Sequence, residues 1–436
     1  MSSLIQIKQM RWILFLWLLP CSLAFSEPLM SRDSGAVKPA SADRASWPSV
    51  QQLVVGSEPV MEVEKPDLKK KTSTVVAKKS QFVSGKSKVL LNGFLSAGAS
   101  QSNAGDDTYY PVPGRGAVSN QIGFAANSLV GLQVTALLTP WADAVTQFVA
   151  SGDSTNGNRA YSLNSGWAFL RLKLSPHAQL HVGRFRLPLF LYSSTQQVGY
   201  SYPWQYLPGE VYRIVPFDNI NGVSTVLVKN IADTGWRLRF QPFFGENQSD
   251  YSLNLIGQNT IKPTQVTLQE NNVAGAQASV GNLHFTLSGA YAHMQLLGKA
   301  AKGFKLNEKN ANFWSVGAKL NTSSVFLAAE FADRNLSNQL NALRGYYATA
   351  GLRLHKWMPT ITYANLSTTN EGSKKLKEAI QDQTSYSFSL DYFINTKLVA
   401  KSSISYVMPN GTVGLFDQQP NKKAVFIYGA ELDAVF

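Results

Sequence analysis

The chain has almost no cysteine, and this scarcity removes several kinds of chemistry. Its single cysteine, Cys21, lies in an apolar stretch at the N-terminus. One cysteine cannot form a disulfide within the chain, and removal of the N-terminal stretch would leave no thiol at all. The sequence therefore excludes a disulfide-stapled secreted domain and a cysteine nucleophile.

Charge and long apolar runs are scarce as well. Charged residues make up 15% of the chain, against about 25% in an average soluble protein. Beyond the N-terminus, no stretch approaches the roughly 20 continuous apolar residues that a bilayer-spanning helix needs, which excludes a multi-span helical protein. The net charge of +13 suits nucleic acid, anionic membranes or anionic solutes.

The N-terminus has the layout of a secretory signal. Lys8 and Arg11 precede the apolar stretch WILFLWLL, and small residues follow it. We expect residues 1–26 to be a signal peptide that is removed on export, which argues against a nucleic-acid partner. A lipid anchor on Cys21 is disfavoured, because Pro20 precedes it in place of a small residue.

Residues 27–84 form a segment of different composition. The segment is rich in Ser, Pro, Val and Lys, and the run EKPDLKKKTSTVVAKKS has no sustained period. We expect it to be flexible. A short coiled coil, or a plug that folds back into the rest of the chain, stays open as an alternative.

From Lys88 onward, apolar and polar residues alternate in segments of strand length. In WAFLRLKL, for example, Leu170 and Leu172 share one face, while Arg171 and Lys173 share the other. This period of two indicates strands with two different faces. We expect strands near 88–100, 128–139, 143–151, 165–174, 178–186, 222–229, 235–245, 271–281, 283–297, 311–320, 323–333, 344–355, 358–366, 383–394, 396–407 and 423–436.

The connections between these strands alternate between long and short. Turns such as TPWAD, SPH and HKW are short, whereas long connections are expected at 101–127, 152–164, 187–221, 246–270, 298–310, 334–343, 367–382 and 408–422. Long loops on one rim and tight turns on the other are typical of even-stranded outer-membrane barrels. The sequence thus predicts an all-β protein, a closed antiparallel transmembrane β-barrel of about 16 strands over residues 85–436, with 27–84 in the periplasm. Trp141 and Trp357, in short turns, suit the periplasmic aromatic girdle.

The last segment, AVFIYGAELDAVF, is apolar on one face and carries Glu431 and Asp433 on the other. We expect the apolar face to meet lipid and the strand to pair with the first one, because an unpaired edge in hydrocarbon is costly. The terminal aromatic resembles the C-terminal signal that the assembly machinery of bacterial outer membranes recognises. Ala434 is a mild departure from that pattern. The residues expected to carry the signal are Tyr428, Leu432 and Phe436.

The third long connection, 187–221, is too aromatic for a disordered surface loop. Its stretches GRFRLPLF, VGYSYPW and VPFDNINGVS resemble the bacterial outer-membrane porin superfamily, and most closely its phosphate-selective and dicarboxylate-uptake branches. The resemblance implies sixteen strands, a third loop that folds into the pore and constricts it, and a homotrimer. The acidic loop motif of general cation-preferring porins is absent. The constriction residues expected are Tyr192, Tyr200, Tyr202, Trp204, Tyr206, Glu210, Tyr212, Arg213 and Asp218.

Many basic residues fall on the polar faces of the expected strands. Rings of Arg and Lys favour anions in a pore, so we expect an anion preference. Alternatively, some of them reach the rims and contact lipopolysaccharide phosphates or neighbouring carboxylates, and a register slip of one residue would reverse every assignment. The residues expected to line the pore are Arg171, Lys173, Arg184, Arg186, Arg237, Arg239, Lys319, Arg353, Lys397 and Lys401.

Nothing in the sequence favours an enzyme. His177 and His181 are four residues apart, but on an expected turn and strand that spacing does not bring the side chains together. No cofactor, metal site or catalytic residue is expected. The function predicted is passive diffusion of small hydrophilic, preferably anionic, solutes. A non-conducting adhesin-like barrel, and a fatty-acid channel that uses 27–83 as a hatch, are the alternatives.

Overall fold

A computed structural model describes residues 81–84, 87–112, 115–153, 160–215, 217–231, 234–257, 260–300, 305–336, 339–372 and 378–436. The expected signal peptide and most of the expected flexible segment lie outside these residues. The last four residues of that segment form a short strand, β1 (Gln81–Ser84), which pairs antiparallel with the start of β2.

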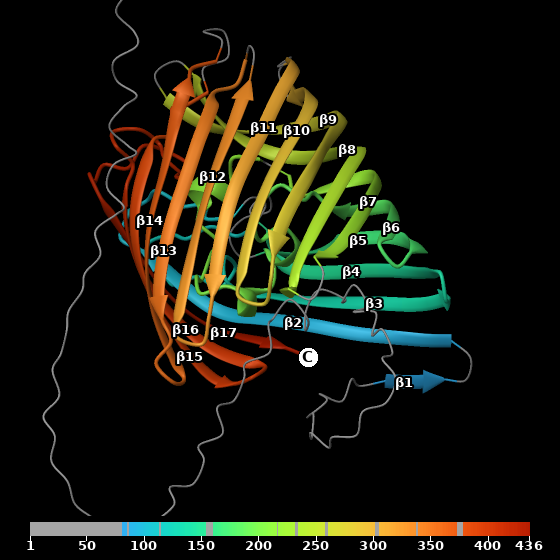
Figure 1. Ribbon diagram of the computed structural model, residues 1–436. Helices are drawn as coiled ribbons and strands as arrows, with labels where there is room; N and C mark the ends of the chain where they lie inside the picture. The colour runs from blue at the N-terminus through green and yellow to red at the C-terminus, as the bar shows by residue number, and fades with distance from the viewer. Residues whose placement is uncertain are drawn as a thin grey trace, which may run out of the picture. The chain divides into compact units, whose positions relative to one another are not determined.

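The described chain forms one antiparallel sheet that closes into a barrel (Figure 1). Each strand from β2 onward pairs with the next, and β17 pairs with β2. Apart from β1, the sheet has sixteen strands, so the predicted fold and strand number are confirmed. They are β2 (Ser87–Ser102), β3 (Leu129–Thr139), β4 (Ala142–Asp153), β5 (Ala160–Ser175), β6 (Ala178–Arg186), β7 (Asn219–Ile231), β8 (Trp236–Gly257), β9 (Thr260–Gly281), β10 (Phe285–Ala300), β11 (Lys305–Asn321), β12 (Val325–Leu336), β13 (Ala342–Leu352), β14 (Trp357–Asn370), β15 (Gln383–Asn395), β16 (Leu398–Met408) and β17 (Val425–Val435).

Three of the predicted long loops are wrong. The segment 152–164 is more than half strand, because β4 reaches Asp153 and β5 begins at Ala160. The segment 246–270 is mostly strand, because β8 and β9 are 22 residues each and stay paired as far as Gly257 and Thr260. The segment 298–310 is likewise shortened by β10 and β11, which reach Ala300 and Lys305. These stretches are polar, which resembles a loop. Strands that extend beyond the bilayer do not need an apolar face, because the hydrogen bonds between their backbones keep them paired.

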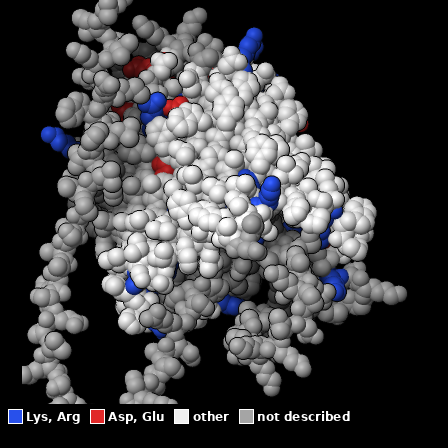
Figure 2. Space-filling view, in the orientation of Figure 1, with Lys and Arg blue, Asp and Glu red and all other residues white. Residues whose placement is uncertain are grey.

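The two faces of the wall differ as the alternation predicts. On β17, Tyr428 and Leu432 are exposed on the outside, whereas Glu431 and Asp433 are buried inside. Figure 2 shows that the visible outer wall is largely uncharged. Apolar side chains outside and polar ones inside are the pattern of a barrel that crosses a lipid bilayer. Within the described part of the chain, no helix is long and apolar enough to cross a membrane.

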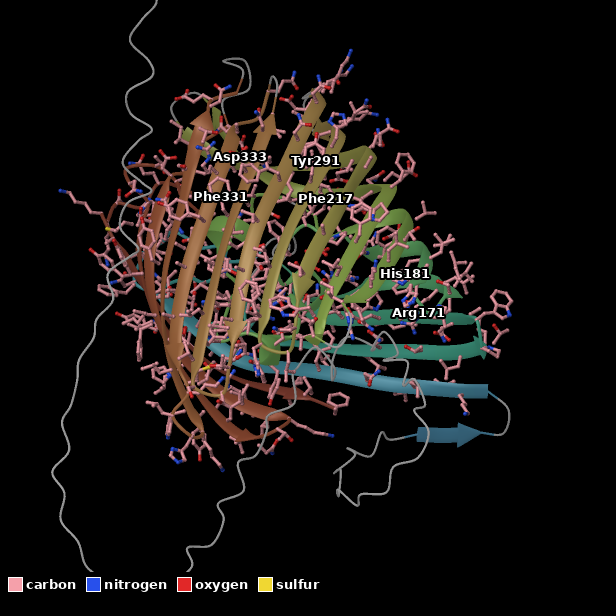
Figure 3. The ribbon with its side chains drawn as sticks, in the orientation of Figure 1. Arg171, His181, Phe217, Tyr291, Phe331 and Asp333 are labelled. Atoms are coloured by element: carbon pink, nitrogen blue, oxygen red, sulfur yellow. The ribbon has the colours of Figure 1, made fainter. Side chains whose placement is uncertain are left out.

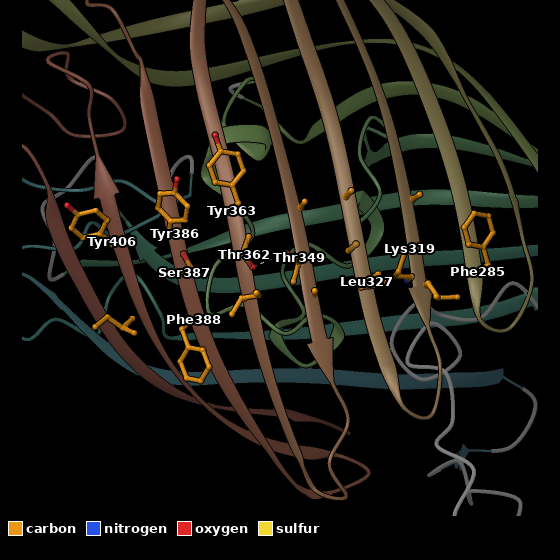
Figure 4. Close-up of a pocket in the computed structure, with 18 of the residues that line it drawn as sticks. Phe285, Lys319, Leu327, Thr349, Thr362, Tyr363, Tyr386, Ser387, Phe388 and Tyr406 are labelled. Atoms are coloured by element: carbon orange, nitrogen blue, oxygen red, sulfur yellow. Dashed lines mark hydrogen bonds between the residues drawn. The ribbon is translucent and has the colours of Figure 1, made fainter. Parts of the chain in front are cut away.

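The outer wall also carries an apolar hollow of about 1040 Å³ across β10 to β17 (Figure 4). Its lining includes Leu327, Ile361, Tyr386 and Phe388, all of which are exposed. The hollow lies between these large side chains, where small residues such as Ala350 fill less of the wall's surface. The hollow is therefore a surface suited to hydrocarbon.

Barrel closure involves the end of the last strand directly. The backbone N–H of Phe436 donates to the carbonyl of Gly93 at 2.9 Å, and the N–H of Gly93 donates back to Phe436 at 2.8 Å. A Cβ atom at position 93 would lie 2.2 Å from the ring of Phe436. A glycine at this position lets the ring of Phe436 lie across the neighbouring strand. The side chains of Trp141 and Trp357 are exposed at short turns, as the girdle would require.

Candidate functional site: the constriction of the barrel

The connection between β6 and β7 folds into the barrel, as predicted. We call residues 187–218 the constriction segment. It contains two single turns of 3-10 helix, η2 (Ser193–Thr195) and η3 (Gly199–Ser201), and one short helix, α1 (Gly209–Tyr212). Its side chains are buried with inward-facing residues of the wall. Burial of this aromatic surface explains why the segment is ordered.

One side of the constriction segment is bonded to β12, β13 and β14. The hydroxyl of Tyr212 donates to Glu330 Oε2 at 2.8 Å, and the backbone N–H of Leu191 donates to Glu330 Oε1 at 2.7 Å. The indole N–H of Trp204 donates to the hydroxyl oxygens of Thr362 at 2.8 Å and Thr349 at 3.2 Å. These bonds hold the segment against the wall rather than at the rim.

The other side is held by β15 and by loops near the barrel mouth. Glu210 Oε1 accepts from the side chains of Gln383 at 2.7 Å and Ser385 at 2.6 Å. Arg213 Nη1 donates to the carbonyl of Tyr110, and also to that of Leu415 at 3.3 Å. The Glu210 carboxylate and the Arg213 guanidinium therefore anchor the segment.

Tyr202 and Tyr206 add neutral polar groups. The Tyr206 hydroxyl donates to Ser100 Oγ or to Asn127 Oδ1, both of which lie within hydrogen-bond reach. Burial raises the pKa of both hydroxyls above the ordinary value of tyrosine. Both phenols thus stay neutral at physiological pH, and the charge of the constriction comes from other groups.

Lys401 joins the constriction segment to the wall. Its Nζ donates to the carbonyls of Gly199 at 2.6 Å and Trp204 at 3.3 Å, and it lies 2.7 Å from Asp433 Oδ2 and 3.6 Å from Glu431 Oε1. The ammonium group is almost completely buried. Its charge is therefore committed to two carboxylates and two carbonyls.

Arg171 and Lys173 of β5 face the interior, and both pair with one carboxylate. Asp143 Oδ2 lies 2.8 Å from Arg171 Nη2 and 3.0 Å from Lys173 Nζ. Figure 3 labels Arg171 beside His181, its register partner on β6. The ring of His181 packs against Phe169 at a centroid distance of 4.7 Å. Within the described residues, no group of histidine, cysteine or acidic side chains could hold a metal ion.

The remaining basic residues are spread around the barrel. Arg186 pairs with Asp218 of the constriction segment. Lys397 lies in the exposed turn between β15 and β16, one residue before the strand on which we expected it. The others contact uncharged groups: Arg184 with Asn221 and Asn247, Arg237 with Asn230, Arg239 with Gln277, Lys319 with the ring of Tyr192, and Arg353 with Asn321.

A cavity of about 400 Å³ lies beside the constriction segment. Its polar lining includes Asp218 of the segment, Arg184 of β6, Asn247 of β8 and Arg115 of the connection between β2 and β3, with further polar residues from β4, β5 and β7. Several residues of the constriction segment line this cavity, so a solute inside it would contact the segment. It brings together seven parts of the chain: the connection between β2 and β3, the constriction segment, and strands β4, β5, β6, β7 and β8.

Sequence reasoning missed Arg115, Asp143 and Glu330. Arg115 lies in a connection that was read only as a long loop, and nothing in its neighbours indicates that it turns inward. Asp143 and Glu330 alternate with apolar residues, which places them on the inner face, but their partners are 28 and 118 residues away in the sequence. The first pairing depends on the register between β4 and β5, and the second on the folding of the constriction segment against β12.

Neither a protein-family model nor a curated protein sequence matches the chain. Solved structures do. A structure of Salmonella typhi OmpF in complex with daunomycin is 13% identical, covers 82% of this chain and 100% of its own, and has a TM-score of 0.53. An anion-selective porin from Comamonas acidovorans is 14% identical, covers 80% and 100%, and has a TM-score of 0.52.

A third structure, the in-vitro folded OmpT of Vibrio cholerae in a trimer form, is 9% identical, covers 80% and 99%, and has a TM-score of 0.50. These likenesses agree with the closed antiparallel barrel of sixteen strands found here. Even-stranded barrels with this lipid-facing wall are outer-membrane proteins. The chain has the fold of the bacterial outer-membrane porins.

Proposed function

We propose that the protein is a porin, a water-filled channel through which small hydrophilic solutes diffuse passively. The observation that carries this proposal is the ordered constriction segment inside a closed barrel. A segment fixed in place by hydrogen bonds to several wall strands sets a size limit without needing to move. The proposed activity is not enzymatic, and it needs no cofactor.

An anion preference is the second part of the proposal. Arg184, Arg237 and Lys319 contact uncharged partners on the inner wall, so their positive charge remains available to a passing solute. Arg171, Lys173 and Lys401 contribute less, because Asp143, Asp433 and Glu431 neutralise them. A structural relative that is named an anion-selective porin supports this reading.

We further propose a homotrimer with lipid and lipopolysaccharide around it. Support comes from one similar structure, described as a trimer form, and from the apolar outer wall. We also propose that the outer-membrane assembly machinery inserts the barrel, with Tyr428, Leu432 and Phe436 as the part of β17 that it recognises. All three side chains are exposed on the lipid-facing side.

Planar-bilayer recordings of the purified protein in a KCl gradient test the channel and its sign. We expect stepwise conductance and a reversal potential closer to the equilibrium potential of chloride than to that of potassium. A reversal potential closer to the equilibrium potential of potassium would contradict the anion preference but would leave the proposal of a channel standing. Absence of conductance from folded protein would contradict the channel itself.

A non-conducting structural barrel is the second candidate. The observation in its favour is the number of wall strands to which the constriction segment is bonded, from β12 to β16. The same recordings separate the two, because a barrel closed by this segment carries no current. The fatty-acid channel would use a hatch that lies mostly outside the described residues.

A further inference from the structure

An ion pair lies on the outer side of the barrel wall. Asp333 of β12 and Arg344 of β13 are register partners, and Asp333 Oδ2 lies 2.9 Å from Arg344 Nη2. Leu343 and Gly345, on either side of Arg344, are buried against the barrel interior, so the alternation of the strand turns Arg344 outward. Charges that face hydrocarbon are costly. The pair therefore marks the level at which this wall leaves the hydrocarbon and meets lipid headgroups.

Aromatic side chains lie directly below this pair, on the side of the short turns. Phe331 of β12 and Tyr346 of β13 are the next outward residues and are register partners. Figure 3 labels Phe331 and Asp333 on this wall. The guanidinium of Arg344 lies 5.7 Å from the centroid of the Phe331 ring, which stacks on Trp314 of β11 at a centroid distance of 4.9 Å. Aromatic rings gather where a barrel wall reaches the membrane interface. Arg344 is thus held at the upper edge of an aromatic belt, at the level of lipid phosphates.

The apolar hollow of the outer wall lies below the belt. Ala329 and Ala348, which line it, are register partners and lie four residues along their strands from Asp333 and Arg344. At about 3.3 Å per residue, the ion pair is about 13 Å above these alanines. Ala350 continues the hollow further down β13. The wall therefore combines a recess for hydrocarbon chains with a cation at headgroup level above it.

Three lysines lie above the ion pair on the same wall. Lys305 and Lys309 of β11 are exposed, whereas Leu306 and Glu308, which alternate with them, are buried inside. Lys299 of β10 is exposed and lies directly opposite Lys305 in the register. Like charges directly opposite each other are destabilising. A bound anion would relieve this repulsion.

The outward charges of β10 to β13 are mostly positive. Four cations, Lys299, Lys305, Lys309 and Arg344, stand against the single carboxylate of Asp333. The other charged residues of these four strands face the barrel interior: Glu308, Lys319, Glu330 and Arg334. This excess of positive charge at headgroup level is complementary to a lipid that carries more than one phosphate.

We propose that the outer face of β10 to β13 is a binding site for one phosphorylated glycolipid with several acyl chains, which is the chemistry of lipid A. Asp333 accepts from Arg344 Nε at 3.0 Å and fixes the guanidinium, which donates to a phosphate through Nη1. Lys309 attracts further phosphate, and the acyl chains occupy the hollow. The inference rests on the proposed lipopolysaccharide around the barrel and names the face that binds it. It does not depend on conductance.

The test is native mass spectrometry of the purified protein in detergent, titrated with diphosphoryl lipid A. We expect one tightly bound lipid A per chain, and weaker binding of phosphatidylglycerol, which has one phosphate and two chains. Inorganic phosphate should not displace lipid A, because it lacks the chains. Arg344→Gln should weaken lipid A binding by about tenfold, since a hydrogen bond between charged groups contributes about that factor in affinity. Arg344→Lys should give intermediate binding, because it keeps the charge but loses the planar fork.

Two further variants separate the phosphate contacts from the hollow. Ala350→Trp fills the hollow and should weaken lipid A binding while the ion pair and the single-channel conductance stay unchanged. Lys309→Gln leaves the ion pair intact and should also weaken binding, so it provides the comparison if Arg344→Gln fails to fold. Lys229→Gln is its matched control, because Lys229 is an exposed lysine at the end of β7 next to a short turn.

Equal affinity of the wild type for lipid A and phosphatidylglycerol would overturn the site, because the wall would then take ordinary lipid only. Unchanged lipid A binding in Arg344→Gln and Lys309→Gln would overturn it as well. An oligomer that binds no lipid A and that Ala350→Trp dissociates would assign this face to a second copy of the chain instead. Absence of current from a wild type that binds lipid A would contradict the channel and leave the lipid site standing.

Discussion

The indole N–H of Trp204 donates to the hydroxyl of Thr362 at 2.8 Å, although 158 residues separate them. This bond links the middle of the constriction segment to β14. The hydroxyls of Thr349 and Thr362 also lie 2.8 Å apart and can bond each other. Loss of the indole donor therefore leaves no unsatisfied hydroxyl behind.

Trp204→Phe should loosen the constriction segment without emptying its packing site. The expected cost is about 1 kcal/mol of unfolding free energy, the net value of one neutral hydrogen bond. We expect noisier open-channel current in bilayer recordings and a lower midpoint of thermal unfolding. Trp141→Phe, at an exposed turn, is the control. An identical effect of both changes would show that the bond does not hold the segment.

Lys401→Met should destabilise the barrel strongly. The change leaves the buried carboxylates of Asp433 and Glu431 without their cation, and breaking a buried pair from one side costs about 3–5 kcal/mol. We expect reduced yields of folded protein and a lower urea midpoint. The triple change Lys401→Met, Asp433→Asn and Glu431→Gln should recover most of the loss. If the triple variant does not regain stability, the loss in Lys401→Met comes from the packing of the lysine side chain and not from its charge.

Gly345→Ala should displace the constriction segment. A Cβ atom at this position would lie 1.9 Å from the backbone carbonyl oxygen of Glu210, and the backbone cannot rotate away as a side chain would. We expect altered single-channel conductance from protein that still folds. Gly289→Ala is a matched control in β10, where a Cβ would meet its nearest neighbour at 3.5 Å. Equal conductance in both variants would mean that the segment adapts in place.

Asp143→Asn should strengthen the anion preference. The amide keeps the shape of the side chain but removes the negative charge that lies between Arg171 and Lys173. Both cations then act on permeating ions, so the reversal potential in a KCl gradient should move toward the chloride potential. Glu371→Gln, an exposed loop position, is the control. An unchanged reversal potential would show that Asp143, Arg171 and Lys173 lie away from the path of the ions.

Glu378, in the connection between β14 and β15, should make stability depend on pH. Burial, with the charge of Glu308 as a lesser cause, raises its pKa. The stabilising contribution is complete below the unfolded pKa of about 4.3 and is lost as pH rises through the higher folded pKa. We expect the unfolding midpoint to fall across that window and the fall to be smaller in Glu378→Gln. Parallel pH profiles would contradict this assignment.

The strand alternation was enough to predict the barrel. Leu170 and Arg171 fall on opposite faces because a strand turns successive side chains to opposite sides, whatever the rest of the chain does. The number of strands and the closure of β17 onto β2 follow from such local patterns, whereas the folding of the aromatic connection into the barrel was implied by the porin resemblance. The polar ends of β8 and β9 escaped prediction, since paired strands outside the bilayer need no apolar face.

The sequence by itself thus determined the barrel, its two faces and the place of the constriction segment. Only the tertiary structure decided which charges are available to a solute. Arg171 and Lys401 share the inward register, yet each is paired with a carboxylate on a neighbouring strand. Arg115, from an unpatterned loop, has no ion pair among the described residues, and its buried Nη2 has no hydrogen-bond partner. The physical reason is that period-two alternation acts over a few residues. Charge pairing depends on the register between neighbouring strands, which brings Asp143 opposite Arg171 and Glu431 opposite Lys401 across long stretches of sequence.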